Sequence, residues 1–383
     1  CIIFTEMIRR WSILLIAAVA MTLPAPSFAA PPPEIRVLVI DGSGPMTISG
    51  GNSQISATFG QSKKETALGK RLLVRSDSSG IYIDGKPYPD GTVLANKASA
   101  YSIGDRTFHG SLELQRNGEG LLKVINRLQL ERYLVGIVGS EISPSWPAEA
   151  MKAQVVAART YAMNKMQAMR KSNSQKPYDI VATVLAQVYH GSHVEDPRAL
   201  AAVEETRGEM LYRNGAIFPA YYHSCCGGIT EHAHNVWDGE RGGPAIVDGF
   251  CKKSPKAKWN YDISLSAFRN TLGTSGKMIG EISAVETILL PDSPRVDLLV
   301  IEDENGLQMI EARELRRIFG YQNIKSTWFE ASLSGGNISF TGNGYGHGVG
   351  MCQWGSKAMA EAGKNYKEIL SHYYPDAQIN RAY

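Results

Sequence analysis

The segment from Pro147 to about Lys171 has the longest uninterrupted regular pattern in this 383-residue chain. Proline suits the first turn of a helix because its φ is already near the helical value, and the alanine-rich residues that follow include no proline or glycine. Apolar side chains recur after four, three and four residues, at Met151, Val155, Ala158 and Ala162. This spacing predicts a long helix with one face against a core, so the fold must provide that core surface.

The chain before this helix is typical of short β-strands. Runs such as Ile35–Ile40 and Gly80–Gly85 alternate with glycine turns, and further strand-like runs extend from Phe108 to Asn126. Further helices are expected at residues 197–206, 354–362 and 366–373. This order predicts an α+β (mixed α/β) fold, with a β-rich region over residues 31–107 joined to a larger domain over residues 108–383.

The first thirty residues have the pattern of a secretory signal. Arg9 and Arg10 precede an apolar run at residues 11–23, and a small-residue cleavage site follows at Ser27–Ala30. Prolines end the run where a membrane helix would have to continue. We therefore expect a cleaved leader over residues 1–30, no membrane segment in the mature protein, and a secreted, periplasmic or cell-wall location.

Charge and cysteine content narrow the possible partners. Loss of the leader removes two arginines and one glutamate and changes the formal charge from +3 to +2, which gives no support for a nucleic-acid partner. An isoelectric point near 8.5 is compatible with a polymer that carries scattered carboxylates. Disulfides can form in an exported protein, and the cysteines that remain are Cys225, Cys226, Cys251 and Cys352.

Glu141 is the first residue with a candidate chemical role. It is expected in the loop that leads into the long helix, with Val138, Ile142 and Trp146 nearby. An apolar setting disfavours the charged form of a carboxyl group, and the resulting raised pKa is what a general acid requires. The alternative, which composition alone favours, is a solvated loop glutamate or a cap of the helix.

A second segment gathers metal-ligand residue types within about a dozen positions. Its members are His223, Cys225, Cys226, His232 and His234. Imidazole and thiolate bind zinc, but the spacing fits none of the usual zinc templates, and adjacent cysteines also suit disulfides. We therefore expect no metal cofactor here and keep zinc as the alternative.

A third segment, Gly342–Gly355, has glycine at almost every second position around His347. Glycine lets the backbone approach a ligand closely because no Cβ intervenes. Neither dinucleotide nor P-loop phosphate motifs are present in register. A tight turn before a helix, with His347 bonded to backbone, explains the pattern equally well.

Together, in this order, the three segments resemble the stage II sporulation protein D family, also called the amidase enhancer family. The resemblance extends from about Phe108 to the end of the chain and rests on Ser140-Glu141, Glu149–Gln154, Ala157–Tyr161, His223-Ser224, Gly227-Gly228, Gly344–Met351, Gln353–Gly355 and Tyr366–Pro375.

The resemblance implies a lytic transglycosylase. Such an enzyme cleaves the bond from N-acetylmuramic acid to N-acetylglucosamine in peptidoglycan, usually on glycan whose stem peptides an amidase has removed. Glu141 matches the family's catalytic glutamate, which acts first as an acid and then as a base while the sugar's own 6-hydroxyl closes a 1,6-anhydro ring. A second carboxylate, as ordinary glycosidases require, remains open at Asp179, Asp196 or Glu231.

The same resemblance predicts an extended glycan cleft. Its substrate-binding residues are His223, Ser224, Tyr345, His347 and Gln353. Arg159 and Tyr161 are expected to pack the helix. The expected partners are peptidoglycan glycan strands and a cell-wall amidase.

Departures from the family pattern concern the cysteines. Zinc-bearing members resemble one another in two cysteines around the stretch Asp179–Tyr189, and this chain has neither. Cys225 and Cys352 replace residues that are commonly hydroxylated, in two motifs expected to share a cleft. We predict that Cys225 pairs with Cys352 and Cys226 with Cys251, one of three possible connectivities.

Two other functions fit parts of the pattern. A non-catalytic glycan binder that stimulates a separate amidase needs the same cleft but tolerates the replacement of Glu141 by glutamine. A zinc amidase or peptidase that uses the His/Cys segment would lose its activity to chelators.

Overall fold

A computed structural model describes residues 30–60, 64–172, 176–182, 187, 189–192, 196–239 and 243–383. The leader expected over residues 1–30 lies outside the described residues except for Ala30, so it stays a prediction. Pro32–Ala382 forms one compact unit. Among the described residues, no helix is both long and apolar enough to cross a bilayer.

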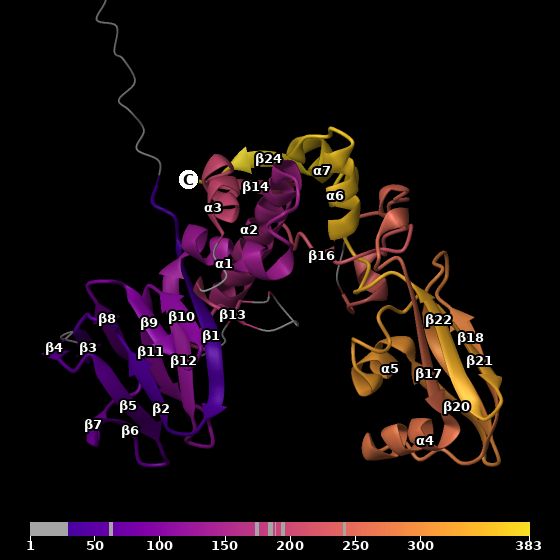
Figure 1. Cartoon of the computed structure of the whole chain (residues 1–383), viewed down its shortest axis with the longest axis horizontal. Helices are drawn as coiled ribbons and strands as arrows, with labels where there is room; N and C mark the ends of the chain where they lie inside the picture. The colour runs from indigo at the N-terminus through magenta and orange to yellow at the C-terminus, as the bar shows by residue number, and fades with distance from the viewer. Residues whose placement is uncertain are drawn as a thin grey trace, which may run out of the picture. The chain divides into compact units, whose positions relative to one another are not determined.

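Two sheets form the N-terminal part of the fold (Figure 1). The first has the order β13 (Ile180–Val181), β1 (Glu34–Ser43), β12 (Leu122–Gln129), β11 (Ser111–Arg116), β8 (Thr92–Asn96), β3 (Ile55–Phe59) and β4 (Lys64–Ala67). The second has the order β10 (Arg106–His109), β9 (Ala100–Ile103), β2 (Met46–Ser49), β5 (Arg71–Ser76), β6 (Ile81–Ile83) and β7 (Lys86–Tyr88).

The expected β-rich N-terminal region is confirmed, and its strands show the alternation of a half-buried sheet. In β5, Leu72 and Val74 are buried while Arg71 and Leu73 are exposed. The first sheet also includes strands from both sides of residue 107, because β11 pairs with β8 and β12 pairs with β1. The sheet therefore continues to Gln129, directly before the first helix.

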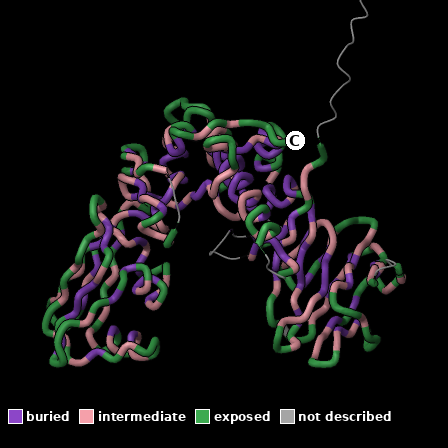
Figure 2. The backbone as a smooth tube through the Cα atoms, turned by 180° about the vertical axis from the view of Figure 1, so that it is seen from behind, coloured by how far each residue is buried: buried purple, intermediate pink, exposed green. Residues whose placement is uncertain are grey.

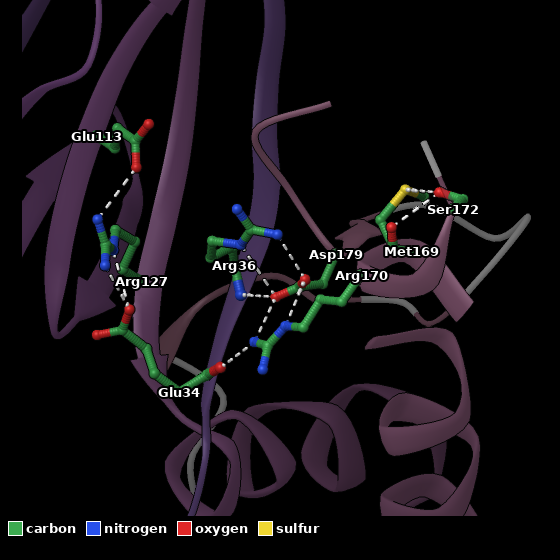
Figure 3. Close-up of polar contacts among 8 residues, drawn as sticks. All are labelled: Glu34, Arg36, Glu113, Arg127, Met169, Arg170, Ser172 and Asp179. Carbon is green, nitrogen blue, oxygen red and sulfur yellow. Dashed lines mark hydrogen bonds and ion pairs between the residues drawn. The ribbon is translucent and has the colours of Figure 1, made fainter. Parts of the chain in front are cut away.

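Asp179 joins the first sheet to the long helix (Figure 3). Its carboxylate accepts hydrogen bonds from Arg36 of β1, at 2.8 Å from Nη2, and from Arg170 of the helix, at 3.2 Å from Nη2. Burial alone would raise the pKa of Asp179, but the hydrogen bonds from the two guanidinium groups outweigh burial and lower it. The side chain therefore acts as a structural clamp between β1, β13 and the helix.

The central helices are α1 (Leu130–Glu141), α2 (Ala148–Lys171), α3 (Pro197–Glu205), α6 (Gln353–Glu361) and α7 (Tyr366–Tyr373). The predicted long helix is confirmed as α2, and it packs against the other four (Figure 1). Met151, Val155, Ala158 and Ala162 are buried as expected. The burial is wider than one stripe and includes Gln154, Arg159 and Thr160, because four helices pack against α2. Figure 2 shows buried backbone in purple in this central helical part.

The structure corrects the position expected for Glu141. It is the last residue of α1, and the loop that leads into α2 begins one residue later, at Ile142. Gly136 lies inside α1, although glycine disfavours a helix interior. Its reason is close packing: a Cβ on Gly136 would lie 2.8 Å from the ring of Tyr189 and 3.0 Å from the carbonyl oxygen of Gly191.

The C-terminal part adds small sheets and two helices. They are β14 (Glu209–Arg213) with β15 (Ala216–Ile217) and β24 (Gln378–Arg381), β16 (Tyr222–His223) with β23 (Met351–Cys352), β17 (Lys258–Ser264) with β22 (Asn337–Asn343) and β21 (Phe329–Ser334), β18 (Ile282–Leu289) with β19 (Val296–Asp303) and β20 (Gly306–Glu311), and the helices α4 (Leu265–Thr274) and α5 (Ala312–Phe319). The last six strands and both helices enclose a core of their own, in which Phe268 stacks on Phe319 at 4.8 Å between ring centroids.

A buried ion pair sets the register between α1 and α2. Arg159 is fully buried and binds both carboxylate oxygens of Glu131, at 3.0 and 2.8 Å. Its guanidinium also donates to the carbonyl oxygens of Val203 and Glu209. The expectation that Arg159 packs the helix is thereby confirmed.

We predict that Arg159→Met lowers the free energy of unfolding by about 3–5 kcal/mol, because Glu131 is left as an unpaired buried charge. Urea titration followed by circular dichroism measures this loss. Lys364→Met is the control, because its pair with Glu368 is exposed and screened by water, so its loss costs much less. Equal losses in the two variants would contradict the structural role of the buried pair.

Candidate functional site

Glu141 lies where α1, α2 and α6 meet. Its half-buried side chain accepts a long hydrogen bond at Oε2 from Gln353 Nε2, at 3.5 Å. The same Gln353 amide donates to Gln154 Oε1 at 3.4 Å. Gln154 therefore orients Gln353 toward Glu141, which is a contact that the sequence alone did not reveal.

Two tyrosines lie near Glu141, of which Tyr133 is buried and Tyr222 is half-buried. The charge of Glu141 contributes to the raised pKa values of Tyr133 and Tyr222, in which burial is the larger cause. Both phenols bind Gln187, at 3.1 Å from Tyr133 and 3.0 Å from Tyr222. The raised pKa values keep both phenols neutral.

An aromatic pair lies beside these residues along the chain. Trp146, in the loop after α1, contacts Trp354 of α6 edge to face, with ring centroids 5.1 Å apart. Both rings are half-buried. In the sequence, Trp146 follows Glu141 by five residues and Trp354 is the residue after Gln353. The pairing depends on the fold, since 208 positions of chain separate the rings.

The second and third sequence segments meet through a short parallel ladder. β16 pairs with β23, so that His223 lies opposite Cys352. His223 Nδ1 bonds to the carbonyl oxygen of Val349 at 3.1 Å, and the amide of Val349 donates to His347 Nδ1 at 3.1 Å. The two imidazole rings, here called the histidine pair, are 5.6 Å apart.

The histidine pair is electrically neutral at ordinary pH. Burial, followed by the charge of Arg295, lowers the pKa of His223 to about 3. Burial is the largest cause that lowers the pKa of His347 well below its usual value, and the neighbouring His223 and Arg316 add to it. His223 Nε2 is buried and has no hydrogen-bond partner among the described residues.

The glycines around His347 serve the close packing of this ladder. Gly350 has φ +71° and a Cβ there would lie 2.0 Å from the carbonyl oxygen of Tyr221. Gly346 has φ +112° and a Cβ there would lie 3.0 Å from the Cβ of His223. The sequence left two explanations for this motif, close approach to a ligand or a tight turn with His347 bonded to backbone. The packing of these two glycines agrees with the tight turn.

A cavity of about 540 Å³ opens on this ladder. Its walls include Tyr221, Tyr222, Trp237, Tyr345 and His347. Tyr221 stacks on Trp237 at 4.2 Å, and Tyr345 donates to Gln322 at 2.7 Å. Tyr161 also lines the cavity, in addition to packing the helix.

The predicted site residues thus fall into two groups. Tyr345 and His347 line the cavity, whereas Glu141 and Gln353 contact each other and are not among its lining residues. The buried ring of His223 contacts that of His347. Ser224 is half-buried, and its carbonyl oxygen accepts a hydrogen bond from the amide of Trp354. Tyr222 connects the groups, since it lines the cavity and interacts with Glu141.

Of the three carboxylates considered as partners of Glu141, two have structural tasks. Asp179 is the clamp on β1, and Asp196 caps the amino end of α3 by accepting from the amide of Arg198 at 2.8 Å. Glu231 does line the cavity, but it is buried and paired with Arg295 at 3.5 Å.

The predicted disulfides are wrong: the four cysteines of the described chain are free and buried. Cys226 and Cys251 have sulfur atoms 3.3 Å apart, and Cys251 also interacts with the other two thiols. Each sulfur thus has several sulfur neighbours instead of one bonded partner.

We predict that His347→Asn flattens the fall of stability in mild acid. The unfolded chain accepts a proton near pH 6.5 that the folded His347 resists, so its contribution is complete above that pH and declines below it. The slope due to one such histidine reaches about 1.4 kcal/mol per pH unit. Unfolding free energies from pH 7.5 to 5.0 measure it, and identical slopes for wild type and variant would contradict the neutral state.

Two family models match successive parts of the chain. A family model described as "Stage II sporulation protein" matches residues 118–212, which include Glu141 and α2, and a domain of unknown function matches residues 247–350. The chain is 31% identical over 312 residues to an uncharacterised protein of Brachyspira hyodysenteriae, covering 81% of this chain and 80% of that one.

Named relatives have similar identity. The stage II sporulation protein D of Bacillus amyloliquefaciens is 30% identical over 272 residues, which cover 67% of this chain and 76% of the relative. The amidase enhancer of Bacillus subtilis is 28% identical over 295 residues, 64% of this chain and 40% of the relative. This identity and coverage show that the chain belongs to the stage II sporulation protein D family.

Proposed function

We infer that this protein is an exported lytic transglycosylase that cleaves the bond from N-acetylmuramic acid to N-acetylglucosamine in peptidoglycan glycan strands. The observation that carries the proposal is the setting of Glu141. One half-buried carboxyl group accepts a hydrogen bond from the oriented amide of Gln353 and interacts with Tyr222, which lines the aromatic cavity.

The chemistry needs one group that both gives and takes a proton. Glu141, as the acid, donates its proton to the glycosidic oxygen, and that bond breaks to leave an oxocarbenium-like centre on the muramic acid sugar. The carboxylate then takes the proton of the sugar's 6-hydroxyl, whose oxygen closes on the centre to form the 1,6-anhydro ring. Water is not consumed, so no second carboxylate is required to activate it. Asp179 and Asp196 have structural roles, which agrees with a mechanism that needs one catalytic carboxylate.

Aromatic surfaces support the proposed substrate class. Sugar rings present C–H faces that pack on aromatic side chains, and their hydroxyl and N-acetyl groups require hydrogen-bond partners. Trp146 and Trp354 are half-buried and provide such faces in the loop after α1 and in α6, and Trp237 and Tyr345 provide them in the cavity. We propose glycan without stem peptides as the preferred form, in a periplasmic or cell-wall location.

A second function is favoured by the relative named amidase enhancer. In that case the same surface binds glycan without cutting it and stimulates a separate cell-wall amidase. The two functions differ at Glu141, because a binder does not need its proton.

We predict that Glu141→Gln abolishes the release of products with 1,6-anhydromuramic ends from denuded glycan strands, with a loss of at least about a hundredfold, because glutamine cannot exchange the proton. Mass spectrometry of the products measures the effect. Glu204→Gln is the matched control, because Glu204 is an exposed residue of α3 that pairs with Arg207. New reducing ends would indicate hydrolysis, and no product from either wild type or control would favour the binder.

We also predict that Trp354→Ala weakens binding to denuded glycan about threefold to tenfold, because a ring face of the Trp146–Trp354 pair is lost. Equilibrium depletion of soluble glycan strands measures this affinity. Tyr88→Ala, which removes an aromatic ring from the second N-terminal sheet, is the control. Equal affinities of the Trp354→Ala variant and wild type would place the glycan elsewhere.

A further inference from the structure

Four buried cysteines come together from three separate parts of the chain. Cys225 and Cys226 follow β16, Cys251 lies in a 3₁₀ helix at Phe250–Lys253, and Cys352 ends β23. One ligand atom each from Cys226, Cys251, Cys352 and Asp248 lies within 4.8 Å of the others. The Cys225 thiol interacts with those of Cys251 and Cys352. We propose that Cys225, Cys226, Cys251 and Cys352 hold one structural zinc ion as thiolates.

The spacing of the sulfur atoms agrees with a single tetrahedral ion. Zinc–sulfur bonds of about 2.3 Å in a tetrahedron place the sulfur atoms about 3.8 Å apart. Cys226 and Cys251 are 3.3 Å apart in the structure, so a small outward movement admits the ion. Two disulfides would instead divide the cysteines into pairs, yet Cys251 interacts with all three other sulfurs. Ligand atoms this close enclose one ion and leave no space for a cluster of several.

Backbone amides already point at these sulfurs. Cys352 Sγ accepts from the amides of Cys226 and Gly355, both at 3.3 Å, and Cys226 Sγ accepts from the amide of Gly228 at 3.4 Å. Such N–H donors stabilise negative charge on sulfur and fix the ligand direction. The cluster is therefore arranged for thiolates.

A buried cation balances the charge of the site. Four thiolates around one divalent ion leave a net negative charge. Arg295 is 1% exposed, donates to the carbonyl oxygen of Cys226 at 3.1 Å, and interacts electrostatically with Cys225, Cys226 and Cys352. Arg295 also pairs with Glu231, so its guanidinium lies between that carboxylate and the cysteine cluster.

Asp248 belongs to the outer shell and Cys225 completes the ligand set. Both oxygens of Asp248 already have donors: Oδ1 accepts from the amide of Phe250 at 2.8 Å and Oδ2 from the hydroxyl of Tyr373 at 3.0 Å. Zinc also prefers thiolate in sites closed by four protein ligands. Such a site has no place for a reactive water, so the ion is structural.

The experiment uses the full chain, isolated without chelators or a metal-binding tag. Elemental analysis is expected to find about one zinc ion per chain, and zinc X-ray absorption to find about four sulfur neighbours at about 2.3 Å. Cys251→Ser and Cys225→Ser are expected to lower the zinc content at least about tenfold, whereas Asp248→Asn keeps the ion with weaker affinity. The absorption spectrum of the wild-type chain decides the ligand set even where a variant fails to fold.

His232→Ala with His234→Ala is the matched control, because their rings stack on each other and neither belongs to the cluster. This double variant is expected to retain zinc. Nitrogen neighbours in the absorption spectrum, loss of zinc in the double variant, or zinc retained by Cys225→Ser would overturn the ligand set. Iron in place of zinc, or disulfide-linked peptides from the metal-free wild-type chain, would overturn the proposal.

Discussion

The buried ion pair between Arg159 and Glu131 is the interaction on which the position of the site depends. α2 is surrounded by helices, so a charged side chain in its middle requires a partner that is also buried. Glu131 lies in the first turn of α1, and Glu141 is the last residue of the same helix. The pair therefore fixes α1 along α2, and with it the level at which Glu141 meets Gln154 and Gln353. A single charge pair in the interior thus determines the setting of the candidate acid.

The second constraint is the parallel ladder of β16 and β23, which is only two residues long on each side. It joins parts of the chain that are far apart in sequence, and the histidine pair, the cavity wall and the cysteine cluster all adjoin it. So short a ladder has few hydrogen bonds of its own, and the additional contacts from Val349 to both histidines support it. The chemical groups of the site are thereby part of its architecture.

The sequence predicted best what local pattern decides. The alanine-rich segment became α2, the expected ends of α6 and α7 lie within a residue or two of the observed ones, and the fold class is α+β. The sequence-based predictions failed where contacts with residues far away in the sequence determine the structure. Glu141 was expected in a loop, whereas it ends α1, a helix that includes Gly136 because Tyr189 packs closely against that position. The contacts of Gln154, Trp354 and the four cysteines are all tertiary, so residue spacing could not disclose them, and the disulfide pairing inferred from family departures was wrong.

The packing of Gly346 and Gly350 affects how descendants of this sequence can vary. At both positions any other residue places a carbon atom against backbone or a neighbouring side chain in a conformation that L-residues rarely adopt. Selection would therefore remove substitutions there even in a lineage that had lost every catalytic or binding activity but still needed a folded domain. Retention of this motif in a distant relative is evidence that the ladder is intact, and evidence of chemistry must come from the residue at position 141.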